Sequence, residues 1–158
     1  MRVGIGYDVH RFESGRRLVL GGVEIPHANG LAGHSDADVA LHAVTDAILG
    51  AAGAGDIGEH FPPTDETWRD ADSGDLLRQA LQIIGPGWSV GNVDLVIIAE
   101  APKINPYRAD IRTRIAEMLE LNESAVNVKA TTTEGLGFVG REEGIAAMAT
   151  AMIIATGD

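Results

Sequence analysis

Apolar and polar positions follow two different periods along the chain, and each period predicts a kind of element. Residues 3–10 alternate and carry β-branched side chains, which predicts a half-buried strand. Short apolar runs predict further strands over residues 17–20, 92–99 and 126–130, with residues 23–26 extending the second of the four. Four stretches of the chain are therefore expected to be strands.

Apolar residues also recur at helical spacing in three stretches, each with a start signal. The first helix is predicted over residues 35–50, with Ser35 as its N-cap and Asp38 three residues later in its first turn. Ser73 is predicted to cap a second helix. Asn105, followed by a proline, predicts the start of a third.

The remaining stretches are a loop and an ambiguous tail. Residues 56–72 are acidic and contain two prolines, which predicts a loop. The tail, residues 145–155, fits a helix, which its alanines favour, or a strand, since short apolar runs cannot be assigned by periodicity alone. Because helices and strands alternate, we expect an α/β (α+β) protein, folded as a single domain over residues 1–158.

Charge and composition narrow the function. The formal net charge of −11 argues against nucleic acid and anionic membrane surfaces as partners. The chain has no cysteine, so any metal site must use His, Asp and Glu. The apolar run over residues 145–155 is too short to span a membrane, and the start shows no signal-peptide pattern. We therefore expect a cytoplasmic protein, although a processed plastid protein would look the same.

One group of candidate residues could converge on a metal or a phosphate. In a strand, Asp8 and His10 point to the same face and would aim at one point. On the first helix, Asp38, His42 and Asp46 follow one another at four-residue steps, and either carboxylate could hydrogen-bond the far nitrogen of His42 and fix its tautomer. Taken alone, His42 is better explained as a solvent-facing helical histidine.

Three further groups suit phosphates and a nucleotide. His34 and Ser35 are predicted to lie at a helix N-terminus, which attracts phosphate. Residues 129–141 combine threonine hydroxyls, a glutamate for a hard cation, an arginine and glycines, and Asp56 at a turn could accept from a ribose diol. Each group also has a structural explanation: a helix cap, a Gly-rich turn and a proline-stiffened loop.

Taken together and in this order, these residues resemble the 2-C-methyl-D-erythritol 2,4-cyclodiphosphate synthase family of the non-mevalonate isoprenoid pathway. The motifs Asp8-Val9-His10 and Lys129 to Glu134 are jointly highly specific. The resemblance covers nearly the whole chain, in the stretches 4–10, 21–23, 34–43, 53–58, 71–73, 91–94, 101–103, 127–134 and 140–141.

The resemblance implies a fold, an assembly and a reaction. The fold is a mixed β-sheet covered by helices on one face, and the tail becomes a strand. Sheets pack together in a homotrimer with active sites between neighbouring subunits. The reaction converts the cytidine diphosphate substrate 4-diphosphocytidyl-2-C-methyl-D-erythritol 2-phosphate to the cyclic diphosphate and CMP by metal-assisted intramolecular phosphoryl transfer, the work of a phosphorus–oxygen lyase.

The resemblance also assigns roles to residues. Asp8, His10 and His42 are implied to ligate zinc, and Glu134 to ligate a second divalent ion, magnesium or manganese. The implied transition-state stabilisers are His34 and Thr132. The implied substrate contacts are Asp8, His10, His34, Ser35, Asp56, Ile57, Gly58, Phe61, Pro62, Pro63, Thr64, Asp65, Ala99, Glu100, Ala101, Pro102, Lys103, Ile104, Asn105, Thr131, Thr132, Thr133, Glu134, Phe138 and Arg141.

Two positions depart from the family pattern. Asn105 stands where members often have an apolar residue, and we expect little effect because backbone atoms recognise the cytosine there. Met148 stands where some members carry a glutamate beside Arg141, and those members can bind an isoprenoid diphosphate on the trimer axis, a property that Met148 leaves open here. Two other functions fit the same residues: a zinc phosphohydrolase and a non-catalytic nucleotide-binding trimer.

Overall fold

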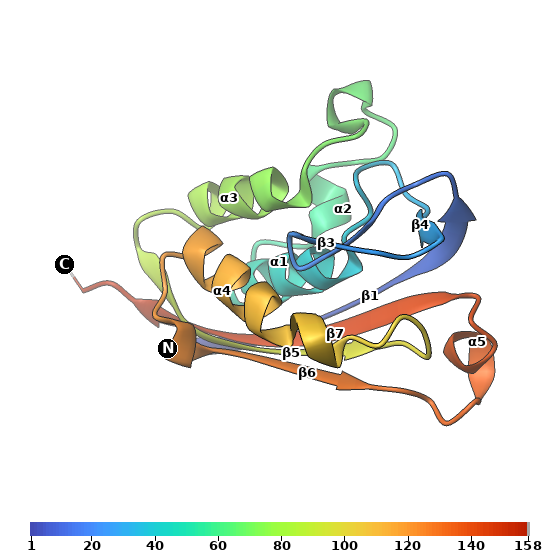
Figure 1. Ribbon diagram of the computed structural model, residues 1–158. Helices are drawn as coiled ribbons and strands as arrows, with labels where there is room; N and C mark the ends of the chain where they lie inside the picture. Colours follow the sequence, from blue (N-terminus) through green and yellow to red (C-terminus); the bar gives the residue numbers. More distant parts are fainter. Residues whose placement is uncertain (158) are drawn as a thin grey trace.

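A five-stranded mixed sheet forms the base of the molecule, with strand order β4-β1-β7-β5-β6 (Figure 1). The computed structural model describes residues 1–157. Neighbouring strands run antiparallel except β5 and β6, which are parallel. A separate hairpin joins β2 to β3. The strands are β1 (Arg2–Ser14), β2 (Leu18–Leu20), β3 (Val23–Ile25), β4 (Asn29–Leu31), β5 (Trp88–Ile98), β6 (Val126–Thr131) and β7 (Gly144–Ala155).

The three longer helices lie on one side of this sheet, so the predicted α/β fold with a one-sided helical layer is confirmed (Figure 1). No helix among residues 1–157 is long and apolar enough to cross a membrane. The helices are α1 (Val39–Ala52), α2 (Ile57–His60), α3 (Ser73–Ile84), α4 (Arg108–Met118) and α5 (Gly137–Gly140), with short 3₁₀ turns η1 (Glu66–Trp68), η2 (Asn105–Tyr107) and η3 (Glu123–Ala125).

Close packing of α1 on β1 decides which way the candidate site faces. A Cβ atom at Gly4 or Gly6 would lie 2.0 Å from the carbonyl oxygen of Ala47 or Ala43, so only glycine allows the helix to approach this strand so closely. Because side chains alternate along a strand, Asp8 and His10 continue the row that begins with these glycines. Both residues therefore point toward α1.

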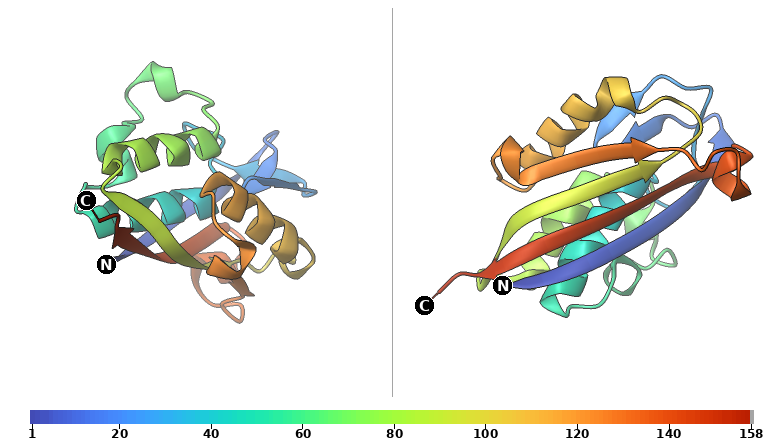
Figure 2. Two further views of the ribbon diagram at one scale, coloured as in Figure 1. Left: turned by 90° about the vertical axis from the view of Figure 1, so that its left-hand side faces the viewer. Right: turned by 90° about the horizontal axis from the view of Figure 1, so that it is seen from below.

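On the other face of the sheet, residues 1–157 place no helix (Figure 2, right). Seen from that side, the strands lie unobstructed in the order β6, β5, β7, β1 (Figure 2, right). Four apolar side chains of β1 point out of this face, and 38–69% of each is exposed: Val3, Ile5, Tyr7 and Val9. Met148 and Ile154 of β7 add to this patch, at 37% and 40% exposed. We call these six residues the open face.

The predicted start of the first helix is wrong by four residues. α1 begins at Val39, and its N-cap is Asp38, whose carboxylate accepts hydrogen bonds from the backbone N–H groups of Ala40 and Leu41. Ser35 instead lies in the preceding loop. The same Asp38 carboxylate accepts from Gly21 and Gly22, so it is fully buried rather than on a polar helix face. Tertiary contacts therefore override the capping signal at Ser35.

Several other boundaries differ from the prediction. Residues 23–26 do not extend the second strand, because Gly21 and Gly22 have φ of 61° and 75° and reverse the chain into the β2–β3 hairpin. α3 begins at Ser73 itself, with Asp72 as its cap. The predicted loop 56–72 contains α2 and η1. Asn105 begins a 3₁₀ turn, and α4 follows it.

The ambiguous tail is a strand, as the family resemblance implied. β7 is hydrogen-bonded on both sides, by β1 and by β5. Its helix-facing residues Ala147, Ala149 and Ala151 are buried. Because α1 packs closely on the sheet, the side chains between them must be small. The alanines are therefore explained by this packing and not by helix propensity.

Candidate metal centre and substrate site

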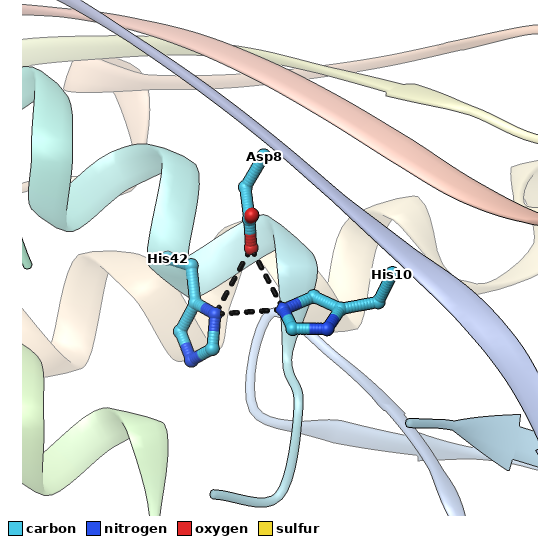
Figure 3. Close-up of side chains that lie close together, drawn as sticks. All are labelled: Asp8, His10 and His42. Carbon is cyan, nitrogen blue, oxygen red and sulfur yellow. Dashed lines mark hydrogen bonds and ion pairs between the residues drawn. The ribbon is translucent and has the colours of Figure 1, made fainter. Parts of the chain in front are cut away.

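Three side chains meet between the sheet and its helical layer. Asp8 and His10 come from β1, and His42 comes from α1 (Figure 3). The Asp8 Oδ2 atom lies 2.9 Å from His10 Nε2 and 3.0 Å from His42 Nδ1, and these two nitrogens lie 3.1 Å apart. The predicted convergence of a strand pair with a helical histidine is thus found in the structure.

This triangle fits a small divalent cation. Zinc bonds of about 2.0–2.1 Å in tetrahedral geometry place the ligand atoms roughly 3.3 Å apart, close to the observed separations. Two imidazole nitrogens and one carboxylate oxygen are a donor set that zinc accepts, and they leave a fourth position for a substrate oxygen. The residues present could therefore hold a metal ion.

The outer nitrogens of both histidines are also hydrogen-bonded. His10 Nδ1 lies 2.6 Å from the Ala32 carbonyl oxygen. His42 Nε2 lies 3.2 Å from Ser35 Oγ and 3.0 Å from Ser73 Oγ. The expectation that Asp38 or Asp46 would contact His42 Nε2 is therefore wrong.

Each of these two carboxylates is engaged elsewhere. Asp38 caps α1, and Asp46 accepts from the backbone N–H of Ile57 at 2.8 Å, which ties α2 to α1. Burial raises the pKa of Asp38 to about 6, while hydrogen bonds from Gly22, Leu41 and Gly21 act in the opposite direction. Asp38 is therefore ionised at neutral pH and suits its role as an acceptor.

The charges in the cluster reinforce one another. Burial alone would raise the pKa of Asp8, but the hydrogen bonds and charges of His10 and His42 outweigh it and hold the pKa well below the usual value. Burial would likewise lower the pKa of His10, yet the hydrogen bond with Asp8 raises it above the usual value. Protons on the imidazoles compete with a metal for the same atoms, so metal binding should weaken as the pH falls.

A cavity of about 220 Å³ opens directly beside the cluster. Asp8, His10, His34, Ser35 and His42 line it, together with Ile57, Gly58, Phe61 and Pro63. These nine residues were all predicted contacts or ligands, and the fold brings them together. Trp68 and Leu76 also line the cavity but were not predicted. The Trp68 ring packs edge-on against Phe61 with the centroids 5.0 Å apart, so it supports the apolar wall.

The prediction that His34 and Ser35 lie at a helix N-terminus is wrong, because α1 begins only at Val39. Hydrogen bonds hold their loop instead. Arg16 donates to the carbonyl oxygens of Gly33 at 2.8 Å and Ser35 at 2.5 Å, and the Asp70 N–H donates to the His34 carbonyl at 2.8 Å. The His34 side chain reaches the Asp65 carbonyl oxygen, 3.1 Å from its Nε2 atom.

A second cluster of predicted residues gathers where β5 and β6 end. The Glu100 carboxylate accepts hydrogen bonds from the backbone N–H groups of Thr133 and Gly135, each at 3.0 Å. Those bonds, from Gly135 first, lower the pKa of Glu100. Glu134, with φ of 53°, projects from this turn, and Thr132 Oγ1 lies 3.4 Å from its Oε1 atom. Glu100 thus fixes the turn that presents Thr132 and Glu134.

The two clusters lie on different strands and well apart within a chain. Thr131 pairs with Ile98, Ile98 with Ala146, and Ala146 with Val9. Three strand spacings of about 4.7–4.9 Å put Thr131 roughly 14 Å from Val9. Residues 99–105 and 131–134 are likewise missing from the lining of the 220 Å³ cavity as the structure describes it. Two halves of the predicted site are present in one chain, but apart.

Arg141 and Phe138 lie on or next to α5, beyond the end of β6. Arg141 donates to the Glu143 carboxylate at 2.7 Å. In the 99–105 segment Ala99 and Ile104 are buried, whereas Asn105 is exposed. Neither α5 nor this segment lines the cavity beside Asp8, His10 and His42.

A family model described as the YgbB family matches residues 1–154. The chain belongs to the YgbB family. Among relatives, "2-C-methyl-D-erythritol 2,4-cyclodiphosphate synthase" of Shouchella clausii is 58% identical over 154 residues, which cover 97% of either chain. The family predicted from the sequence is therefore confirmed.

Solved structures of YgbB-type proteins have the same fold. The bifunctional IspDF from Campylobacter jejuni superposes with a TM-score of 0.93 at 45% identity, over 98% of this chain and 42% of that one. A structure described as 2C-methyl-D-erythritol-2,4-cyclodiphosphate synthase in a CDP-bound form gives a TM-score of 0.88 at 36% identity, over 97% and 100%. The match therefore runs along the full length of the latter solved chain.

Proposed function

We propose that this YgbB-family enzyme converts 4-diphosphocytidyl-2-C-methyl-D-erythritol 2-phosphate to 2-C-methyl-D-erythritol 2,4-cyclodiphosphate and CMP. The observation that carries the proposal is the triangle of Asp8, His10 and His42 beside a cavity, in a chain 58% identical to a synthase of that name. Bacterial relatives and the absence of a membrane-spanning helix over residues 1–157 accord with a cytoplasmic enzyme.

The reaction is an intramolecular phosphoryl transfer. An oxygen of the 2-phosphate attacks the β-phosphorus of the diphosphate, the bond from that phosphorus to the bridging oxygen breaks, and CMP leaves with the bridging oxygen. No covalent bond to the enzyme is needed, so catalysis rests on positioning and on neutralising charge. A divalent cation at Asp8, His10 and His42 would supply positive charge to the diphosphate oxygens.

His34 and Thr132 are the proposed transition-state stabilisers. The His34 ring and the Ser35 loop line the cavity beside the metal cluster, within reach of a diphosphate held there. Thr132 stands beside Glu134, the proposed ligand of a second ion, magnesium or manganese. A single carboxylate is too little to hold magnesium, which prefers several waters and substrate phosphates, so this ion should arrive with the nucleotide.

The nucleotide contacts come from both clusters. Asp56 caps α2 through Oδ1, which accepts from Glu59 N–H at 2.9 Å, and this leaves Oδ2 for a ribose hydroxyl. On the same side as Asp56, the nucleotide would contact residues 61–65, which are Phe61, Pro62, Pro63, Thr64 and Asp65. The cytosine would bind to residues 99–105 and 131–134, with Phe138 and Arg141 nearby. Because these segments lie apart from the metal cluster in one chain, we propose that a neighbouring subunit of a homotrimer supplies them.

Phosphorus NMR tests the function directly. Incubation of the purified protein with substrate, zinc and magnesium should give a cyclic diphosphate and CMP in equal amounts. Release of inorganic phosphate instead would identify a zinc phosphohydrolase. Binding of CDP with no product would identify a non-catalytic nucleotide-binding trimer, and either result would overturn the proposal.

A further inference from the structure

The two candidate histidine ligands present different nitrogens to the metal position. His10 turns Nε2 toward Asp8, whereas His42 turns Nδ1 toward it (Figure 3). A neutral imidazole carries one proton, on one nitrogen or the other, and can bind a metal only through the nitrogen that lacks it. The two residues therefore need opposite tautomers, and each tautomer is set by what the outer nitrogen contacts.

For His10 the choice is settled by the backbone. Its Nδ1 lies 2.6 Å from the Ala32 carbonyl oxygen, which can only accept. Nδ1 must therefore carry the proton, and Nε2 is left with its lone pair toward the metal position. His42 differs at its outer nitrogen. Its Nε2 faces two hydroxyl groups, Ser73 Oγ at 3.0 Å and Ser35 Oγ at 3.2 Å.

A hydroxyl group alone would leave the tautomer of His42 undecided, because it can donate or accept. Asp36 removes the ambiguity. Its carboxylate accepts the Ser73 hydroxyl proton and also the Ser73 backbone N–H at 3.1 Å. With its proton committed to Asp36, the Ser73 oxygen can only accept from His42. The Ser73 side chain is fully buried, so water does not compete for these bonds.

We propose that Ser73 and Asp36 are positioning residues for His42. Hydrogen bonds run from His42 Nε2–H to Ser73 Oγ and from Ser73 Oγ–H to the Asp36 carboxylate, which leaves the Nδ1 lone pair toward the metal. This inference rests on the proposed metal site and is independent of the reaction catalysed there. It assigns a role to the first turn of α3, which supplies no ligand of its own.

Zinc affinity measured by competition with a chelator tests the chain of bonds. Ser73→Ala should weaken zinc binding roughly 10- to 100-fold, the usual effect of removing a group that orients a metal ligand. Thr45→Ala is the matched control. Thr45 is also a fully buried hydroxyl, but its hydrogen bond goes to the Leu41 carbonyl, at 2.8 Å, and not to the His42 ring. The zinc affinity of Thr45→Ala should stay within about twofold of the wild type.

Asp36→Asn tests the direction of the hydrogen bonds. An amide can donate to the serine oxygen and would allow the Ser73 hydroxyl to turn toward His42, so zinc affinity should fall here too. Because both residues act through one chain of bonds, the double variant should bind zinc no more weakly than Ser73→Ala alone. Losses that multiply in the double variant would overturn the proposed chain.

Two further measurements separate orientation of the ligand from general destabilisation. The rise in Tm on adding zinc should shrink in Ser73→Ala but not in Thr45→Ala, since ligand-linked stability follows affinity for the folded state. Nitrogen-15 spectra of the zinc-loaded wild type should show His42 protonated at Nε2. If the wild type binds no zinc, the metal site itself is wrong. If it binds zinc and Ser73→Ala binds it equally well, only the present inference is overturned.

Discussion

Asp8 is the residue on which the candidate site depends most, because one carboxylate oxygen contacts both histidines. It lies in the middle of β1, on the row that Gly4 and Gly6 clear for α1, so its position is set by strand register rather than by a loop. Glu134, by contrast, is exposed on a turn beyond β6. The two proposed metal positions should therefore differ in how tightly they hold an ion.

This difference gives a prediction about metal content. His42→Ala should lose zinc from the purified protein, because two ligands hold the metal far less well than three. Glu134→Gln should keep its zinc and fail to turn over substrate, with partial rescue by excess magnesium. Elemental analysis of both variants, with and without CDP, decides the matter. Zinc retained by His42→Ala, or stripped by Glu134→Gln, would show that the ligands are wrongly assigned.

His34 should affect the rate rather than nucleotide binding. His34 is proposed to stabilise charge in the transition state. His34→Ala should therefore lower kcat roughly 10- to 1000-fold, comparable to removing one donor at an oxyanion. CDP affinity, measured by calorimetry, should change little, since the cytidine contacts lie elsewhere. An unchanged kcat would remove His34 from the mechanism.

Residue-scale chemistry was predictable where it depends on local geometry. The two-residue spacing of Asp8 and His10 is enough to place them on one side of a strand. Ser73 was predicted only as a helix cap, because its contact with His42 arises from the way the start of α3 packs on the 34–36 loop. No local pattern encodes a contact of that kind.

The N-terminus of α1 joins secondary structure to the site. Asp38 accepts from four backbone N–H groups, two in the first turn of α1 and two in the β2–β3 turn. It thereby anchors the helix that carries His42. The sequence predicted this helix and its polar row, but not that its first acidic residue would be buried, since the β2–β3 turn that buries it comes from an earlier segment.

Replacing Asp38 should therefore cost stability. Asp38→Ala removes the N-cap, worth about 0.5–2 kcal/mol, and leaves the buried N–H of Gly21 unpaired at about 1–3 kcal/mol. We expect the free energy of unfolding at neutral pH to fall by about 2–4 kcal/mol in a denaturant titration. Asp72→Ala, at the exposed cap of α3, is the control and should cost about 1 kcal/mol. Equal losses would contradict the anchoring role of Asp38.

The same comparison has a pH dependence of definite sign. Burial raises the folded-state pKa of Asp38 to about 6, above its usual value near 3.8. Between these two pH values the Asp38 carboxyl is protonated in the folded protein but ionised in the unfolded chain. The protonated carboxyl therefore stabilises the fold most below about pH 4, and this contribution is lost as the pH rises through about 6. The stability difference between wild type and Asp38→Ala should shrink over that range, and a difference that grows instead would contradict the raised pKa.

At the scale of the whole molecule, the candidate site residues of one chain form two separate clusters, and one face of its sheet exposes an apolar patch. The triangle of candidate metal ligands lies between β1 and α1, while the residues of the second cluster lie three strands away. The open face presents six large apolar side chains without a covering element among residues 1–157. Contiguous exposed apolar patches on a sheet mark interaction surfaces. Packing of this face against copies of itself would bury the patch and could bring the two clusters together.

The fold of one chain was largely predictable from local pattern, because β1, α1 and α3 each carry a clear repeat and β5 contains an apolar run. The tail was not, since Ala147, Ala149 and Ala151 favour a helix by propensity and become a strand only through pairing on both sides. Two expectations stay predictions: that residues 1–158 form a single domain, and that the protein is a trimer. Both depend on which surfaces of the folded chain make further contacts, and a local sequence pattern does not determine this.

A charge on the open face tests the assembly and the shared site together. Light scattering at micromolar concentration should give the mass of three chains for the wild type. Ile5→Asp, at a β1 position that is 64% exposed, should dissociate the trimer, because it would place an unpaired carboxylate in an apolar interface. Ile83→Asp is the matched control, since Ile83 lies on α3 in the helical layer and is 41% exposed. It should remain trimeric and active.

The dissociated Ile5→Asp chain should lose turnover yet still bind zinc, because Asp8, His10 and His42 belong to one subunit. A monomer with full activity would show instead that each chain holds a complete site.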